Sequence, residues 1–119
     1  MSETDLGAIQ AIALQFAQAI AQRDYVTAHM LTSPSYQQRI SVGEIEAICE
    51  RILPTDWGTI SVVALDDVLE EWPDKRWNDI GWIYVSLEGV VYPYSEGLYI
   101  CVSRENGHLI VSDVTYGRP

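Results

Sequence analysis

The residues from Asp79 to Tyr116, DIGWIYVSLEGVVYPYSEGLYICVSRENGHLIVSDVTY, decide the fold. They are rich in Ile, Val, Tyr and Trp, which favour strands, and Gly, Pro and Asn interrupt them at intervals typical of turns. The pattern predicts three antiparallel strands over Ile80 to Glu88, Glu96 to Arg104 and His108 to Tyr116. Asn106-Gly107, between the last two, is typical of a two-residue hairpin turn of the primed type.

The first half of the chain has helical periodicity instead. Helices are predicted over Leu6 to Ile20, from a cap at Asp24 to Leu31, and from the capping box Ser41-Val42-Gly43-Glu44 to Pro54. Ser33 and Pro34 can also start one more helical turn through Arg39. The β-branched run from Thr59 to Leu65 predicts a first strand, so the fold class is α+β: three helices packed on an antiparallel sheet of about four strands.

Size and composition indicate one domain over residues 1–119. A chain of 13.4 kDa can close a core without disulfides, and a hydrophobic content of 48% excludes wholesale disorder. Seventeen acidic and seven basic residues give a net charge of −10, which disfavours nucleic acids and anionic membranes. The same charge either serves solubility alone or attracts a basic partner protein.

The two cysteines, Cys49 and Cys101, stand among apolar residues and are predicted to be reduced and buried. Their number and spacing fit neither a disulfide framework nor a zinc site, so we expect no metal and no cofactor. Met1 to Asp5 is polar and acidic where a signal peptide requires a basic start, and no apolar run is long enough to span a membrane. A cytoplasmic location is the expectation.

Several segments resemble the nuclear transport factor 2-like superfamily. The break Gln22-Arg23-Asp24-Tyr25 leading into Ala28-His29-Met30-Leu31-Thr32 resembles that family's junction between its first two helices. The Ser41 to Glu44 cap resembles the start of its third helix, and Gly107-His108-Leu109-Ile110-Val111 resembles its final strand. The resemblance implies a cystatin-like cone, in which a strongly curved sheet wraps around the helices and leaves a pocket. It also implies homodimerisation through the sheet.

Relatives in that superfamily differ in function. Ketosteroid isomerase and small polyketide cyclases place an Asp or His base in the pocket with Tyr or acid donors, whereas other members bind proteins, including immunity proteins that neutralise a toxin. The resemblance therefore leaves two functions open. The first is an acidic, immunity-type binding module; the alternative is an isomerase-like or cyclase-like enzyme, or a protein that binds a small apolar ligand in the cone.

The enzyme hypothesis depends on Asp113. If Leu109 and Val111 point inward, strand alternation places Asp113 on the same face, where apolar surroundings would make it a general base or ligand anchor. The opposite face, which carries Val114 and Tyr116, is equally apolar, and on that reading Asp113 is a solvated strand residue. Both orientations stay open.

Aromatic and histidine side chains complete the candidates for a pocket. Tyr84 and Tyr99 could donate a hydrogen bond to a developing oxyanion, although cross-strand aromatic pairs ordinarily serve packing. The ligand-pocket candidates are Tyr25, His29, Trp82, Tyr84, Tyr99 and Asp113.

An acidic, tryptophan-bearing segment precedes the second strand. Its candidates for binding a partner are Asp66, Asp67, Glu70, Glu71, Trp72, Asp74 and Trp77. Aromatic rings framed by acids suit an interface with a basic protein, because the rings supply anchor area and the acids select charge. Alternatively, the tryptophans fold back to close the end of the pocket. The binding module is the function we predict.

Overall fold

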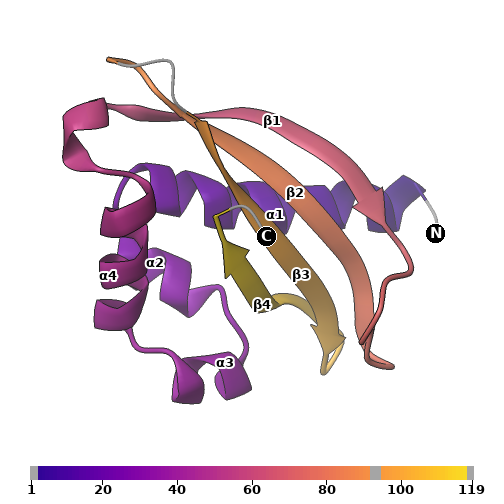
Figure 1. Cartoon of the computed structure of the whole chain (residues 1–119). Coiled ribbons are helices and arrows are strands. Elements are labelled where there is room, and N and C mark those ends of the chain that lie inside the picture. Colours follow the sequence, from indigo (N-terminus) through magenta and orange to yellow (C-terminus); the bar gives the residue numbers. More distant parts are fainter. Residues whose placement is uncertain (1–2, 92–94, 118–119) are drawn as a thin grey trace.

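The chain folds into helices followed by an antiparallel sheet (Figure 1). The computed structural model describes residues 3–91 and 95–117, and within them all side chains except those of residues 3–4, 62–64 and 66–67. The helices described are α1 (Glu3–Ala21), α2 (Tyr25–Met30), α3 (Pro34–Arg39) and α4 (Val42–Ile52), with a 3-10 helix η1 (Thr55–Trp57). The strands are β1 (Ile60–Leu69), β2 (Asp79–Gly89), β3 (Ser95–Glu105) and β4 (His108–Tyr116), adjacent in that order.

The predicted α+β class with an antiparallel sheet is confirmed, but the prediction of three helices is one short. Ser33 accepts a hydrogen bond from the backbone N–H of Tyr36, and Pro34 occupies the first helical turn, so the predicted extra turn forms α3. The first strand continues to Leu69, beyond its predicted end at Leu65. The predicted partner-binding side chains of Asp66 and Asp67 lie outside the described residues.

Caps and turns in the structure follow the predicted signals. Ser41 and Glu44 form both hydrogen bonds of a capping box at the start of α4. Asp24 caps α2 by accepting from the backbone N–H of Thr27 at 3.1 Å. Asn106 and the glycine after it both have positive φ, 51° and 79°, as the primed hairpin turn requires.

The sheet has one face covered by helices and one face that is not covered by the helices described. Along β2 the side chains of Ile83, Val85 and Leu87 are fully buried, whereas Trp82 and Tyr84 alternate with them and are only half-buried. We call the first the inner face and the second the outer face. Helix α1 crosses behind the sheet in Figure 1, and α2, α3 and α4 gather beside β4.

Two bulges at one end of the sheet decide which residues reach the outer face. In the β3–β4 pair, Cys101 lies opposite Asp113 but the next residue, Val102, lies opposite Val111, so Ser112 is an extra residue in β4. The bulge reverses the alternation: Val111 is buried inward and Asp113 is exposed on the outer face. The hypothesis that Asp113 shares a face with Leu109 and Val111 is therefore wrong. A similar irregularity lies between Asp79 and Gly81 in β2.

The open edge of β4 is partly covered from within the chain. Val111 donates a backbone hydrogen bond to Leu31 at 3.0 Å and accepts one from Ser33 at 2.9 Å, which adds a single parallel bridge at Thr32 to this side of the sheet. None of the helices in residues 3–91 and 95–117 combines the length and apolar character that crossing a bilayer requires.

Candidate binding site

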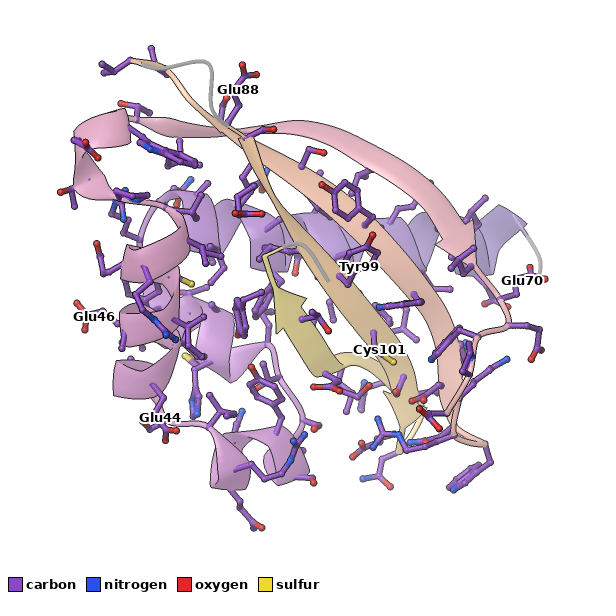
Figure 2. The ribbon with its side chains drawn as sticks, in the orientation of Figure 1. Glu44, Glu46, Glu70, Glu88, Tyr99 and Cys101 are labelled. Atoms are coloured by element: carbon purple, nitrogen blue, oxygen red, sulfur yellow. The ribbon has the colours of Figure 1, made fainter. Side chains whose placement is uncertain are left out.

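A row of four aromatic rings runs over the outer face. Ring centroids are 5.9 Å apart between Trp72 and Trp82, 5.0 Å between Trp82 and Tyr99, and 4.8 Å between Tyr99 and Tyr84. Figure 2 shows Tyr99 on β3 with Cys101 further along the same strand. Gly97 makes room for the row, because a Cβ at that position would lie 2.2 Å from the ring of Tyr84.

Residues 70–78 form the loop that brings Trp72 onto this row; we call it the 70–78 loop. A first turn is closed by the hydrogen bond from Lys75 N to Trp72 O at 3.3 Å. Proline at position 73 and a positive φ of 66° at Asp74 fit the two central positions of a type II turn. The turn folds the loop back, so that the Trp72 indole packs against Trp82 on β2.

The end of the loop is fixed by Asp79, whose side chain is buried. Its carboxylate accepts hydrogen bonds from Arg76 N at 2.8 Å, from Arg76 Nη2 at 3.1 Å and from Ser103 Oγ. Burial alone would raise the pKa of Asp79, but the hydrogen bonds from Ser103 and Arg76 outweigh it and hold this pKa below its ordinary 3.8. Because a carboxylate only accepts, Ser103 gives its single proton to Asp79, and Ser112 must donate to Ser103 across their 2.6 Å contact.

Both basic residues of the 70–78 loop are engaged within the loop or at its end. The ammonium of Lys75 lies 3.1 Å from the Glu71 carboxylate, 2.6 Å from the Glu70 carbonyl oxygen, and 5.5 Å from the centre of a Trp72 ring. The guanidinium of Arg76 pairs with Asp79, which raises the pKa of Arg76. The loop therefore presents acidic and aromatic groups outward while its cations are already paired.

A cavity of about 270 Å³ opens between the loop and the outer face. Its lining residues are Trp72, Pro73, Asp74, Arg76, Asp79, Trp82, Cys101, Asp113 and Thr115. Three carboxylates face one guanidinium, which leaves two formal negative charges at the cavity. Asp74 and Asp113 make no ion pair within the part of the chain that the structure describes.

Trp77, at the outer end of the same loop, is 95% exposed. Tryptophan is one of the more buried residue types on average, and an indole left in water at this level is unusual. The other tryptophan of the loop, Trp72, is half-buried by its contact with Trp82. Of the two predicted anchors, only Trp77 is fully available to a partner.

The six predicted ligand-pocket residues do not form one site. Trp82, Tyr84, Tyr99 and Asp113 share the outer face, whereas Tyr25 and His29 belong to the helical layer. The Tyr25 hydroxyl donates to Glu50 at 3.1 Å, and a ring nitrogen of His29 lies 2.9 Å from the carbonyl oxygen of Ile40. Burial raises the pKa of Tyr25 to about 12, and its contacts tie α2 to α4.

The partner-binding candidates with described side chains fall on one segment. Glu70, Glu71, Trp72, Asp74 and Trp77 all belong to the 70–78 loop, and each of them is exposed or half-buried.

Five residues that line the cavity were not among the predicted site residues: Pro73, Arg76, Asp79, Cys101 and Thr115. Arg76 was not singled out, although its spacing of three from Asp79 suits an ion pair across a turn. Asp79 marked only the start of the strand-rich region, Cys101 was predicted as a buried core residue, and Pro73 and Thr115 carried no site prediction. Their convergence depends on strand pairing and bulges, which leave no local signal in the sequence.

Cys49 and Cys101 are free and buried, which confirms the prediction, and burial raises the pKa of both thiols, that of Cys49 to about 12. Cys101 is therefore protonated and a poor nucleophile, although it lines the cavity.

Among the described residues no group of three His, Cys, Asp or Glu side chains could hold a metal ion. Asp113 is exposed on the outer face, whereas the general-base hypothesis places it inside a buried apolar pocket.

Comparison with protein-family models, with curated proteins and with solved structures found no match to this chain.

Proposed function

We propose that this chain is a binding module that recognises a basic partner protein through the 70–78 loop. The observation that carries the proposal is the 95% exposure of Trp77 on a loop whose own cations, Lys75 and Arg76, are already paired. A partner that approaches the loop meets an indole and carboxylates. Large aromatic anchors surrounded by selective charge are typical of interface hot spots.

Binding would proceed in two stages. The net charge of −10 attracts a basic partner over a distance that salt shortens. Burial of the Trp77 indole then supplies anchor area; truncation of such a hot-spot side chain costs about 2 kcal/mol or more, which is roughly a thirtyfold change in Kd. Trp72 has a different role, because its stacking on Trp82 shapes the loop.

The order of helices and then four antiparallel strands supports a nuclear transport factor 2-like assignment, with the cone and pocket that the family implies. The acidic charge and the exposed indole are compatible with its immunity-protein branch. A homodimer through the outer face also stays a prediction, supported by the half-exposed ring row of Trp82, Tyr99 and Tyr84. Light scattering that gave a monomer at micromolar concentration would contradict the dimer.

The central test compares Trp77→Ala with Met30→Ala. Both side chains are large, apolar and exposed, Met30 at 72%, but Met30 lies on α2, outside the loop. The tagged proteins are used to capture partners from a lysate of the source cells, and each captured protein is then purified and titrated by calorimetry. We expect a basic protein that binds the wild type and the M30A variant equally, and the W77A variant about thirtyfold more weakly or worse. A partner unaffected by W77A, or no partner at all, contradicts the proposal.

A second comparison tests the charge. Glu70→Lys and Glu46→Lys change the net charge equally, and Figure 2 shows Glu46 on α4 and Glu70 by the 70–78 loop, on opposite sides of the molecule. Non-specific attraction would weaken equally in both variants. Recognition through the loop requires a larger loss of affinity and of association rate in E70K than in E46K.

A further inference from the structure

We propose that the cavity beside the 70–78 loop receives one arginine side chain of the basic partner. This inference rests on the proposed function and specifies the chemistry of its contact. Trp77 would anchor the outer end of the loop, and the arginine would enter the space between the loop and the outer face.

Size favours a side chain over a free cofactor or a larger ligand. The cavity of about 270 Å³ is smaller than the roughly 300–1,000 Å³ of most small-molecule sites. Contacts within the chain hold two of its walls, since Trp72 packs on Trp82 and Arg76 donates three hydrogen bonds to Asp79. A partly pre-formed space of this size suits one extended side chain.

Charge and surface chemistry favour a cation. Asp74 and Asp113 carry negative charge at the cavity and make no ion pair within the described residues, whereas Arg76 is already neutralised by Asp79. Trp72 and Trp82 also line the cavity, and indoles are the ring systems that attract cations best. Lys75 lies 5.5 Å from a Trp72 ring centre but does not line this cavity, so it does not fill the space.

Shape selects guanidinium over ammonium. A guanidinium is planar and weakly hydrated, so it can stack on an indole and at the same time give two parallel hydrogen bonds to one carboxylate. Asp113 projects from β4 while Trp82 lies on β2, with Cys101 on the strand between them. Because Trp82 and Asp113 both line the cavity, a guanidinium inside it can contact the indole and the carboxylate together. An ammonium would lose more hydration for fewer fixed contacts.

The test titrates the full chain with N-acetyl-arginine methylamide and follows the four indole N–H signals by NMR, assigned from single Trp→Phe variants. We expect saturable binding with a millimolar Kd, which shifts the Trp72 and Trp82 signals and leaves those of Trp57 and Trp77 in place. The matched citrulline probe, which has the same shape without charge, should produce no saturable shift. A lysine probe should bind more weakly than arginine.

Variants locate the contact. Asp113→Asn should weaken the arginine probe at least about fivefold, whereas Glu46→Gln, a charge loss on α4, should leave it unchanged. Trp72→Leu keeps apolar bulk but removes the indole face, and it should weaken the arginine probe as well. Circular dichroism of each variant verifies folding.

Three outcomes overturn the inference: no saturable arginine binding, equal binding of citrulline or lysine, or no effect of D113N. Failure here is distinguishable from failure of the proposed function, because partner capture depends on Trp77 and the probe does not. If W77A abolishes partner binding but the arginine probe does not bind, the proposed binding module is supported and the arginine contact is refuted. If the arginine probe binds as described but no basic partner is found, the arginine site is supported and the proposed function is refuted.

Discussion

Replacing Asp79 by asparagine tests the hydrogen-bonded ion pair between Asp79 and Arg76, which fixes the end of the 70–78 loop. The two carboxylate oxygens of Asp79 accept four hydrogen bonds: Oδ1 accepts from Ser103 Oγ and Arg76 Nη2, and Oδ2 accepts from Arg76 N and Nε. An asparagine amide keeps one oxygen and puts an NH₂ in place of the other. Whichever way the amide is placed, at least one donor of Arg76 then faces another donor.

The expected cost follows from burial. Only 3% of the Asp79 side chain is exposed, but 52% of the Arg76 side chain is, so water partly compensates the lost partner on the Arg76 side. Hydrogen bonds to charged groups contribute about 1.5–3 kcal/mol each, and a buried group left without its partner costs about the same. We therefore expect D79N to lower the free energy of unfolding by about 2–3 kcal/mol, equivalent to a fall in the urea midpoint of about 1 M or more.

Urea unfolding at a series of pH values measures this effect, with Glu71→Gln as the control. Glu71 also pairs with a cation of the same loop, but its side chain is 85% exposed, so its loss should change stability little. The pKa of Asp79 is lower in the folded chain than its ordinary 3.8. The stabilisation is therefore fully present above that value and is lost as the pH falls through the folded pKa. The difference in free energy of unfolding between the wild type and D79N should stay constant from neutral pH down to about 5 and become smaller in stronger acid. A D79N variant as stable as E71Q at neutral pH would refute the reasoning.

Substitutions at three further positions test the fold around the site. Ser41→Ala removes the cap of α4 and should cost about 1 kcal/mol in urea unfolding, whereas a change within error would contradict the capping box. Arg23 has a φ of 59°, and its side chain bonds Glu50 and the Leu53 carbonyl; both Arg23→Gly and Arg23→Ala should destabilise, with the alanine variant about 1 kcal/mol worse because it keeps the unfavourable φ. Gly97→Ala should displace the Tyr84 ring and lower the melting temperature, and a wild-type near-ultraviolet dichroism spectrum would contradict the ring row.

Local signals predicted most of the fold. The capping box at Ser41, the cap at Asp24 and the Asn106-Gly107 turn all form as expected, because each depends on residues within a few positions of one another. The three C-terminal strands also lie within a residue of their predicted limits. The predicted number of helices was one too low. Helix α3 has only 6 residues, and whether so short a helix forms depends on tertiary packing.

The candidate site was only partly predictable. Period-two alternation assigns faces correctly along β2, but a single extra residue at Ser112 reverses the faces in β4, and nothing in the sequence marks it. Asp113 therefore lies on the outer face, beside Cys101 and on the same side of the sheet as Trp82. A strand that is apolar on both faces gives no second signal from which the reversal could have been detected.

The same long-range pairing separates the two tryptophans of the 70–78 loop. By composition Trp72 and Trp77 are equivalent, since both stand among acids and both could anchor a partner. The turn at residues 72–75 sends Trp72 back onto Trp82, whose outward direction is set by the pairing of β2 with β3. Trp77 lies beyond that turn, between the two residues of the Arg76 to Asp79 ion pair; among the described residues no ring packs on it, and its side chain is 95% exposed. One turn therefore gives the two tryptophans different roles: Trp72 forms a wall of the cavity, and Trp77 is available to anchor a partner.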